Sequence, residues 1–355
     1  MGNPFFDFVR FSLGVAKWER DSPTETQWAY LHEQAQRQAL LGVLFSGVEK
    51  LRKGTAAPMP PILMQWIGEM LAIKAKNELT NQRAEELITI LSKAGFQSCV
   101  LKGQGMSLLY PQPNLRQSGD IDIWVDGTRD DIVQFLRDRG STGSVDIKHC
   151  DWHIFPDVEV EVHFIPTWFY NPFAHKKLLR WLKSQKKSQF EHLSAMGFNT
   201  PDIPFNLVYS LIHIYRHLFD EGVGLRQMLD YYFILKHSTE QERAEAFKVL
   251  RSFRMSRFVG ATMYVQQKVF LMEEQCLMCP AAENDGQFLL DEIMQAGNFG
   301  HFDSRIQHGR HGRWGKGWYN LKRNVRFLRS YPHELCWMPA WKFWHYCWRR
   351  WNRYL

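Results

Sequence analysis

Two carboxylates one residue apart on a predicted strand are the first feature of this chain that could do chemistry. The segment LRQSGDIDIWVDG, residues 115–127, places Asp120 and Asp122 between isoleucines. Side chains alternate along a strand, so both carboxylates share one face, about 7 Å apart, while Ile121 and Ile123 share the other. Like charges this close raise each other's pKa unless a cation shares the site. The pattern therefore fits either a solvated strand face or a platform for a divalent metal ion.

A second alternating strand, VEVEVHF at 158–164, offers further ligands. Glu159, Glu161 and His163 share one face of it, and valines and a phenylalanine share the other. If this strand lies beside DIDIWV, a third carboxylate joins the two aspartates, and the three would repel one another unless metal ions neutralise them. Mg²⁺ takes a few carboxylates and fills its remaining positions with water and substrate phosphates. Two such ions, about 3.5–4 Å apart, stabilise the attacking and leaving oxygens of an in-line displacement.

Groups that could bind phosphate come shortly before the aspartates. The stretch LKGQG places Lys102, Gly103 and Gln104 at a predicted strand-to-helix turn. Backbone N–H groups and a helix N-terminus can meet an anion at such a turn. Arg116, four residues before the first aspartate, could add a bidentate contact to a triphosphate. A glycine turn also occurs as a simple loop, so this stretch alone does not define a site.

The hydrophobic pattern around these strands predicts an α+β fold, in which a small mixed sheet with helices lies between helical N- and C-terminal regions. Thr24 or Thr26 is a plausible cap for the helical stretch that follows it, and Gly95 is a natural helix stop. A helix is also expected between Thr128 and Gly140. We predict a helical region at 1–85, a small mixed core with sheet and helix at 86–165, and a helical region at 166–355 that ends in a basic, tryptophan-rich tail.

Composition sets limits on the class of protein. The chain has 355 residues with 45% hydrophobic content, which suits two or three globular domains. No apolar run reaches the roughly 18 residues that a transmembrane helix needs, and the N-terminus lacks the pattern of a secretory signal. Six scattered cysteines indicate reduced thiols. We therefore expect a cytoplasmic protein.

The net charge of +7 is unevenly distributed. From residue 305 to 355, twelve Lys and Arg stand against Glu334 alone, a net +11, so the other 304 residues carry a net −4. The basic character thus belongs to the tail. Such a tail could meet phosphate groups, nucleic acid or an anionic surface, or it could form a solvated helix face.

The tail CWMPAWKFWHYCWRRWNRYL is also rich in tryptophan. At helical spacing four tryptophans fall within about 80° of arc, flanked by three arginines: Trp341, Trp344, Trp348 and Trp351, with Arg349, Arg350 and Arg353. Packing on the protein body or on a dimer partner is one interpretation. A membrane-surface helix and a base-stacking platform for RNA are the others. The basic, glycine-rich stretch at 307–318 could close over phosphates.

Three further patterns are more simply structural. His213 and His217 lie one helical turn apart, a spacing that can bind zinc, but Ile214 stands where a zinc protease would have its glutamate. Packing is therefore the simpler interpretation of this pair. Two other pairs are interpreted in the same way: Arg226 with Asp230 as an intrahelical ion pair, and the lone CxxC of Cys276 and Cys279 as packing.

The order of these features resembles the polymerase-beta-like nucleotidyltransferase superfamily: a glycine turn, a short helix, an arginine, Asp-x-Asp on a strand, then a later strand carboxylate. More closely, VLKGQGMSLLYPQPNLRQSGDIDIWV, then VEVEVHF, then HIYRHLFDEGVGLRQMLDYYFIL are similar to an uncharacterised bacterial nucleotidyltransferase-like family. Its members read Leu-Lys-Gly, Leu-Tyr-Pro, Arg and Asp-Ile-Asp in that order. The similarity covers residues 85–240, and EIMQAGNFG and YPHEL are similar to the C-terminal region of that family.

The resemblance implies a Mg²⁺-dependent transferase, with up to two ions, that moves a nucleotidyl group from an NTP to a hydroxyl or phosphate acceptor and releases pyrophosphate. It implies roles for the following residues: Asp120, Asp122 and Glu161 as metal ligands, Glu161 also as the base for an acceptor hydroxyl, Lys102, Gly103, Gln104 and Arg116 at the triphosphate, and His163, His213 and His217 near the acceptor. Glu159 stays an alternative third carboxylate. The alternative function is a degenerate nucleotide- or RNA-binding protein that docks through its tail. The acceptor, the choice between ATP and another NTP, and the oligomeric state stay open.

Overall fold

The computed structural model describes residues 2–53, 55, 59–140, 143–303, 305 and 324–352. Four helices form the N-terminal part: α1 (Pro4–Leu13), α2 (Glu25–Arg37), α3 (Leu41–Arg52) and α4 (Pro61–Lys93). Thr24 is the cap of α2, and its hydroxyl accepts a hydrogen bond from the backbone N–H of Gln27. The predicted helical stretch after Thr24 is interrupted at Ala39, whose φ of 54° ends one helix before the next begins.

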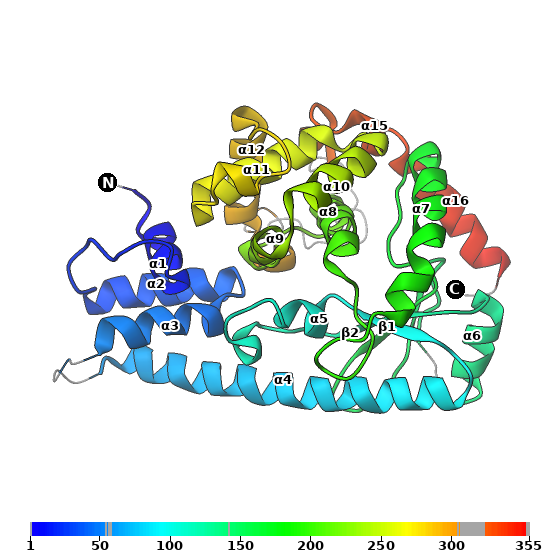
Figure 1. The fold of residues 1–355 in the computed structure, drawn as a ribbon, viewed down its shortest axis with the longest axis horizontal. Coiled ribbons are helices and arrows are strands. Elements are labelled where there is room, and N and C mark those ends of the chain that lie inside the picture. Colours follow the sequence, from blue (N-terminus) through cyan, green and yellow to red (C-terminus); the bar gives the residue numbers. More distant parts are fainter. Residues whose placement is uncertain are drawn as a thin grey trace.

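Helix α4 connects the N-terminal helices to the sheet. It has 33 residues, a length of about 50 Å, and runs along the base of the molecule in Figure 1. Trp66 and Met70 near its start belong to the large core that the N- and C-terminal helices share, whereas Leu87 and Leu91 near its end pack under the sheet. The helix continues across residue 85, where we placed a region boundary, and the three-region division stays a prediction.

The sheet is small and mixed, as expected. Its four strands lie in the order β1-β2-β4-β3, with the bounds β1 (Ser98–Leu101), β2 (Ile121–Val125), β3 (His149–Asp151) and β4 (Val160–His163). Strand β4 pairs in parallel with β2 and antiparallel with β3, while β1 pairs antiparallel with β2. The two alternating strands seen in the sequence are therefore direct neighbours.

Side-chain alternation gives the sheet two different faces. Ile121, Ile123 and Val162 are fully buried on one face, in a core formed with the end of α4 and with helix α6 (Arg129–Arg137). Thr128 begins α6, since its hydroxyl accepts from the N–H of Asp131. The opposite face holds the polar side chains of β2 and β4, and Trp124 on that face packs on C-terminal helices.

The C-terminal part is helical, as predicted. Its helices are α7 (Pro172–Glu191), α8 (Ile203–Asp220), α9 (Leu225–His237), α10 (Glu240–Ser252), α11 (Ser256–Phe270), α12 (Glu283–Ala296), α15 (Pro332–Leu335) and α16 (Met338–Trp351). Phe190 of α7 and Phe205 of α8 pack on Trp124, which holds these two helices over the polar face of the sheet. Figure 1 shows α8 to α12 grouped above the short helix α5 (Gly103–Ser107) and the strands. Three short 3₁₀ turns complete the described elements: Pro113–Leu115, Glu274–Cys276 and Asn298–Gly300.

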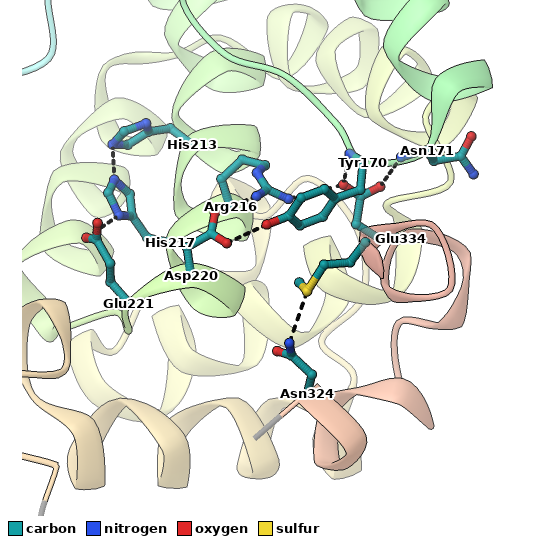
Figure 2. A network of polar contacts seen from close by, with 10 residues as sticks. Tyr170, Asn171, His213, Arg216, His217, Asp220, Glu221, Asn324 and Glu334 are labelled. Carbon is teal, nitrogen blue, oxygen red and sulfur yellow. Dashed lines mark hydrogen bonds and ion pairs between the residues drawn. The ribbon is translucent and has the colours of Figure 1, made fainter. Parts of the chain in front are cut away.

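A buried polar network fixes the C-terminal segment to α8 and to the start of α7 (Figure 2). Arg216 donates to Glu334 at 3.2 Å and also to Asp220. The Glu334 carboxylate accepts from the backbone N–H groups of Tyr170 and Asn171, and Arg216 and Glu334 are 5% and 3% exposed. Charges this deeply buried must be paired to be tolerated, so the network fixes α15 in one position.

The aromatic tail is only partly packed. Trp341 of α16 stacks on Trp168, with ring centroids 4.1 Å apart, which confirms packing on the protein body for this residue. Trp344 and Trp351 are 47% and 88% exposed. The stretch 307–318 and Arg353 lie outside the described residues. No described helix is both long and apolar enough to cross a membrane.

Candidate active site

The strand register brings together the three carboxylates of Asp120, Asp122 and Glu161. Asp122 lies opposite Glu161 in the parallel pair of β2 and β4, and Asp120 directly precedes β2. One oxygen of each carboxylate lies within 4.8 Å of the others. The Glu159 side chain is exposed. Only its backbone is involved in the pairing with β2, because its carbonyl accepts a hydrogen bond from the N–H of Ile121. The structure therefore places Glu161, rather than Glu159, next to the aspartates.

Two basic side chains meet the central carboxylate. Lys102 Nζ and His163 Nε2 lie 2.7 Å and 2.8 Å from Oδ1 of Asp122, which is 3% exposed. Lys102 lies directly between β1 and the next helix and has a backbone conformation that is rare for a residue with a side chain, with φ 51° and ψ −127°. Such strain costs about 1–3 kcal/mol and clusters at functional sites. His163, which we expected near the acceptor, lies inside the carboxylate cluster.

The carboxylates differ in their pKa values. Repulsion from Asp122, together with burial, raises the pKa of Asp120 to about 6. For Asp122 the cost of burial is outweighed by Lys102 and by the hydrogen bond to His163, which hold its pKa well below the usual range. For Glu161 the cost of burial is likewise outweighed by the hydrogen bond from His163, and its pKa is about 2. At neutral pH three ionised carboxylates therefore face two cationic partners at most, a charge balance that suits a bound metal ion.

The glycine turn lies beside this cluster. Helix α5 (Gly103–Ser107) begins there, and a Cβ on Gly103 would lie 3.8 Å from the backbone oxygen of Asp120. Gln104 is 1% exposed, and neither polar atom of its side chain has a hydrogen-bond partner among the described residues. The predicted phosphate turn and the predicted metal site are thus adjacent.

Arg116 has a different partner from the one expected. Its Nε and Nη2 donate to the two carboxylate oxygens of Asp230, at 2.7 Å and 2.8 Å, and Tyr110 donates to the same carboxylate. With Arg116 only 3% exposed, this pair anchors the segment before β2 to α9. The predicted intrahelical pair of Arg226 with Asp230 is therefore wrong, because Asp230 bonds Arg116 instead. The contact of Arg116 with a triphosphate stays a prediction.

Arg226 instead donates to the backbone oxygen of Gln117 at 2.8 Å. It is 9% exposed, and its Nε has no hydrogen-bond partner among the described residues. Burial, reinforced by repulsion from Arg116, lowers the pKa of Arg226, whereas attraction from Asp120 and Asp230 acts in the opposite direction. A buried arginine without its own bonded carboxylate is a candidate for binding an anionic substrate.

Helix α8 lies over the carboxylates and carries the two histidines of HIYRH. Their Nε2 atoms are 2.8 Å apart, and His217 also contacts Glu221 at 3.0 Å (Figure 2). Burial, together with repulsion from Lys102 and His217, lowers the pKa of His213 well below its usual value, which favours its neutral form. Neither histidine belongs to the groups of described residues that could hold a metal ion.

The comparisons with known proteins agree with this geometry. Residues 24–270 match the model of a protein family described as an uncharacterised nucleotidyltransferase. The chain belongs to this family. No curated protein and no solved structure matches the chain.

In this member of the nucleotidyltransferase family, two residues near the carboxylates were not identified from the sequence. Tyr209 of α8 is fully buried, its hydroxyl has no hydrogen-bond partner among the described residues, and burial beside Asp122 raises its pKa well above the usual value. His149 of β3 lies opposite His163 in the sheet, and burial beside His163 lowers its pKa to about 4. The alternation of His149, Asp151 and His153 in KHCDWH would have indicated a polar strand face. No local signal marked Tyr209.

The CxxC pair agrees with its structural interpretation. Cys276 and Cys279 pack against the large apolar core, which confirms the packing interpretation of the CxxC pair.

Proposed function

We propose that this protein is a Mg²⁺-dependent nucleotidyltransferase, which moves a nucleotidyl group from an NTP to a hydroxyl or phosphate acceptor. The observation that carries the proposal is the convergence of Asp120, Asp122 and Glu161 within 4.8 Å, beside the Gly103 turn. Membership of the nucleotidyltransferase family supports nucleotidyl transfer. Three carboxylate donors suit a hard cation such as Mg²⁺, which when bound would neutralise charge on the phosphoryl oxygens. We keep the cytoplasmic location expected from the scattered cysteines as part of this proposal.

Different residues of the protein would bind the triphosphate, line the acceptor side and bind the metal ion. Lys102 and the Gly103 turn would bind the triphosphate, with the buried Gln104 amide donating to it and Arg226 as a further cation. His213 and Tyr209 on α8 would line the acceptor side. Glu161 is the more exposed carboxylate of the two strands, 33% against 4% for Asp122. A pKa of about 2 makes Glu161 a poor proton acceptor at neutral pH, which favours metal binding over the role of base.

Nucleotide-dependent thermal unfolding tests the proposal. A ligand at a hundred times its Kd adds about 2.7 kcal/mol to the free energy of unfolding. We expect one or more of the four NTPs to stabilise the wild-type protein in the presence of Mg²⁺ and not in its absence. The double variant Asp120→Asn, Asp122→Asn should lose this stabilisation, whereas Asp130→Asn, which changes an exposed carboxylate on α6, should keep it. Stabilisation that is unchanged in the double variant would contradict the metal assignment.

The exposed part of α16 favours a second candidate function, the binding of RNA. Phe343, Trp344 and Trp351 are 72%, 47% and 88% exposed, next to Arg349 and Arg350 in sequence. Exposed aromatic rings with nearby cations bind single-stranded RNA by base stacking, worth about 1–3 kcal/mol per base. On this reading the protein is a degenerate family member that binds nucleotide or RNA without transfer.

Variants in the tail separate the two functions. Replacing Trp344 and Trp351 by alanine should weaken binding of a fluorescent single-stranded RNA and leave the NTP-dependent stabilisation unchanged. Equal RNA affinity in the variant and the wild type would remove the tail from consideration. Turnover of an NTP with any acceptor would exclude the degenerate function.

A further inference from the structure

We propose that the edge of the sheet formed by β3 and β4 holds a second metal site, which binds a transition-metal ion such as Zn²⁺ through His149, Glu161 and His163. This site is distinct from the carboxylate site, although the two share Glu161. It does not depend on nucleotide transfer, because the proposal concerns binding of the metal ion alone.

The strand register creates the site. His149 lies opposite His163, and Asp151 lies opposite Glu161, in the antiparallel pair of β3 and β4. Cross-strand partners point to the same face, so both imidazoles and the Glu161 carboxylate share the polar face of the sheet. One ligand atom from each of His149, Glu161 and His163 lies within 4.8 Å of the other two.

The distances between the ligand atoms fit a tetrahedral metal ion. Glu161 Oε2 lies 3.5 Å from His149 Nδ1 and 3.3 Å from His163 Nε2. Ligands at the usual Zn–N and Zn–O distances of about 2.0–2.1 Å in a tetrahedron are about 3.3–3.4 Å apart. The separation of Glu161 and His149 is too long for a good hydrogen bond, whereas it is the right length for two ligands of one ion.

Burial supports a ligand at this position. The side chains of His149 and His163 are 14% and 4% exposed. The Nδ1 atom of His149, which faces Glu161, forms no hydrogen bond with any described residue. An unsatisfied buried polar atom costs about 1–3 kcal/mol, a cost that a metal–nitrogen bond would remove. Asp151 Oδ1 lies 3.5 Å from the other ring nitrogen, the place of the carboxylate that commonly orients a metal-binding histidine.

The donor atoms of this site differ from those of the carboxylate site beside it. Imidazole nitrogen suits Zn²⁺, Co²⁺ and related ions, whereas Mg²⁺ prefers sites of oxygen alone. Asp120 and Asp122 provide oxygen, and His149 and His163 provide nitrogen, while Glu161 belongs to both sets. The Nε2 of His163 also lies 2.8 Å from Asp122 Oδ1, and this hydrogen bond is given up when Nε2 binds the metal ion. We therefore expect a metal ion that prefers nitrogen to occupy the histidine side.

Titration with Co²⁺, followed by its visible absorption, tests the proposal on the full-length chain without an affinity tag. We expect the wild-type protein to bind one Co²⁺ with the intense visible bands of a four-coordinate ion, and Zn²⁺ to displace it. His149→Gln should weaken binding by about tenfold or more and remove these bands. His301→Gln, which changes an exposed histidine far along the chain, should bind as the wild type does.

Two further variants separate this proposal from the proposed function. Asp120→Asn should keep the Co²⁺ spectrum, because Asp120 is not a ligand of this site, and Glu161→Gln should lose it. His149→Gln should keep the stabilisation by Mg²⁺ and NTP, which also shows that this variant is folded. Co²⁺ binding by His149→Gln with wild-type affinity and spectrum would overturn the proposal, as would a spectrum dominated by sulfur-to-cobalt charge transfer from cysteines.

Discussion

Asp120 differs from the other two carboxylates of the cluster because its pKa is raised to about 6, chiefly by repulsion from Asp122. A metal ion must displace the proton that Asp120 holds below that pH. Metal affinity should therefore rise with pH up to about 6 and level off above it, with a loss of about tenfold per pH unit on the acid side.

Mn²⁺ binding, measured by electron paramagnetic resonance between about pH 5 and about pH 7.5, checks this expectation, with the window set by the raised pKa of Asp120. Asp120→Asn should bind more weakly and lose most of the pH dependence, because the variant side chain has no proton to release. An affinity of the wild type that is flat across this range would show that Asp120 is not a ligand.

A substitution at Gly103 tests the predicted phosphate turn, also at the scale of single residues. A Cβ there would make only ordinary van der Waals contact with the backbone of Asp120, so Gly103→Ala should change the free energy of unfolding by less than about 1 kcal/mol. The added methyl group would nevertheless occupy the space through which phosphate approaches the backbone N–H groups. We expect NTP-dependent stabilisation to fall while the apo protein stays as stable. Gly68→Ala, on an open surface inside α4, is the control: it should stabilise the apo protein by up to about 1 kcal/mol and leave the NTP-dependent stabilisation unchanged.

At the scale of elements, three contacts hold the segment that carries Asp120. Asn77 of α4 donates to the backbone oxygen of Arg116, Arg226 donates to that of Gln117, and the Arg116 side chain pairs with Asp230 of α9. A cation left buried after its partner is removed costs about 3–5 kcal/mol. Asp230→Ala should therefore lower the free energy of unfolding in urea by that amount.

The control for this prediction is Asp138→Ala, which changes a solvent-facing carboxylate at the end of α6 and should cost less than about 1 kcal/mol. A similarly small effect of Asp230→Ala would mean that Arg116 is not held by Asp230. Arg116 would then be available for the triphosphate, as the sequence predicted.

The strands and the ends of several helices could be predicted because their signals are local. Alternation in DIDIWV and VEVEVHF identified β2 and β4, and Thr24, Thr128 and Gly95 mark the ends of helices in the structure. The pair of Arg116 with Asp230 could not be predicted, since 114 positions separate the two residues. The same limit applies to Tyr209 on α8, whose place beside the carboxylates is set by how α8 packs on Trp124.

At the scale of the whole molecule, two apolar cores hold the elements around the candidate site. One lies between the sheet, the end of α4 and α6, and it supports the back of the site. The other extends from Phe5 of α1 to Met338 of α16 and joins the helices of both termini. Most buried side chains of β2 and β4 belong to the first core, whereas Trp124 of β2 and helix α8 belong to the second. The candidate site therefore lies where the two cores meet, and its geometry depends on both.

The central claim is that Asp120, Asp122 and Glu161 bind the metal ion of a bound nucleotide. The most direct measurement is an anomalous difference map from crystals of the full chain, grown with Mn²⁺ and a non-hydrolysable NTP analogue. We predict a Mn²⁺ peak between the three carboxylates, with the analogue's phosphates at the Gly103 turn. A well-ordered nucleotide bound elsewhere, with no Mn²⁺ peak at these carboxylates, would contradict the account.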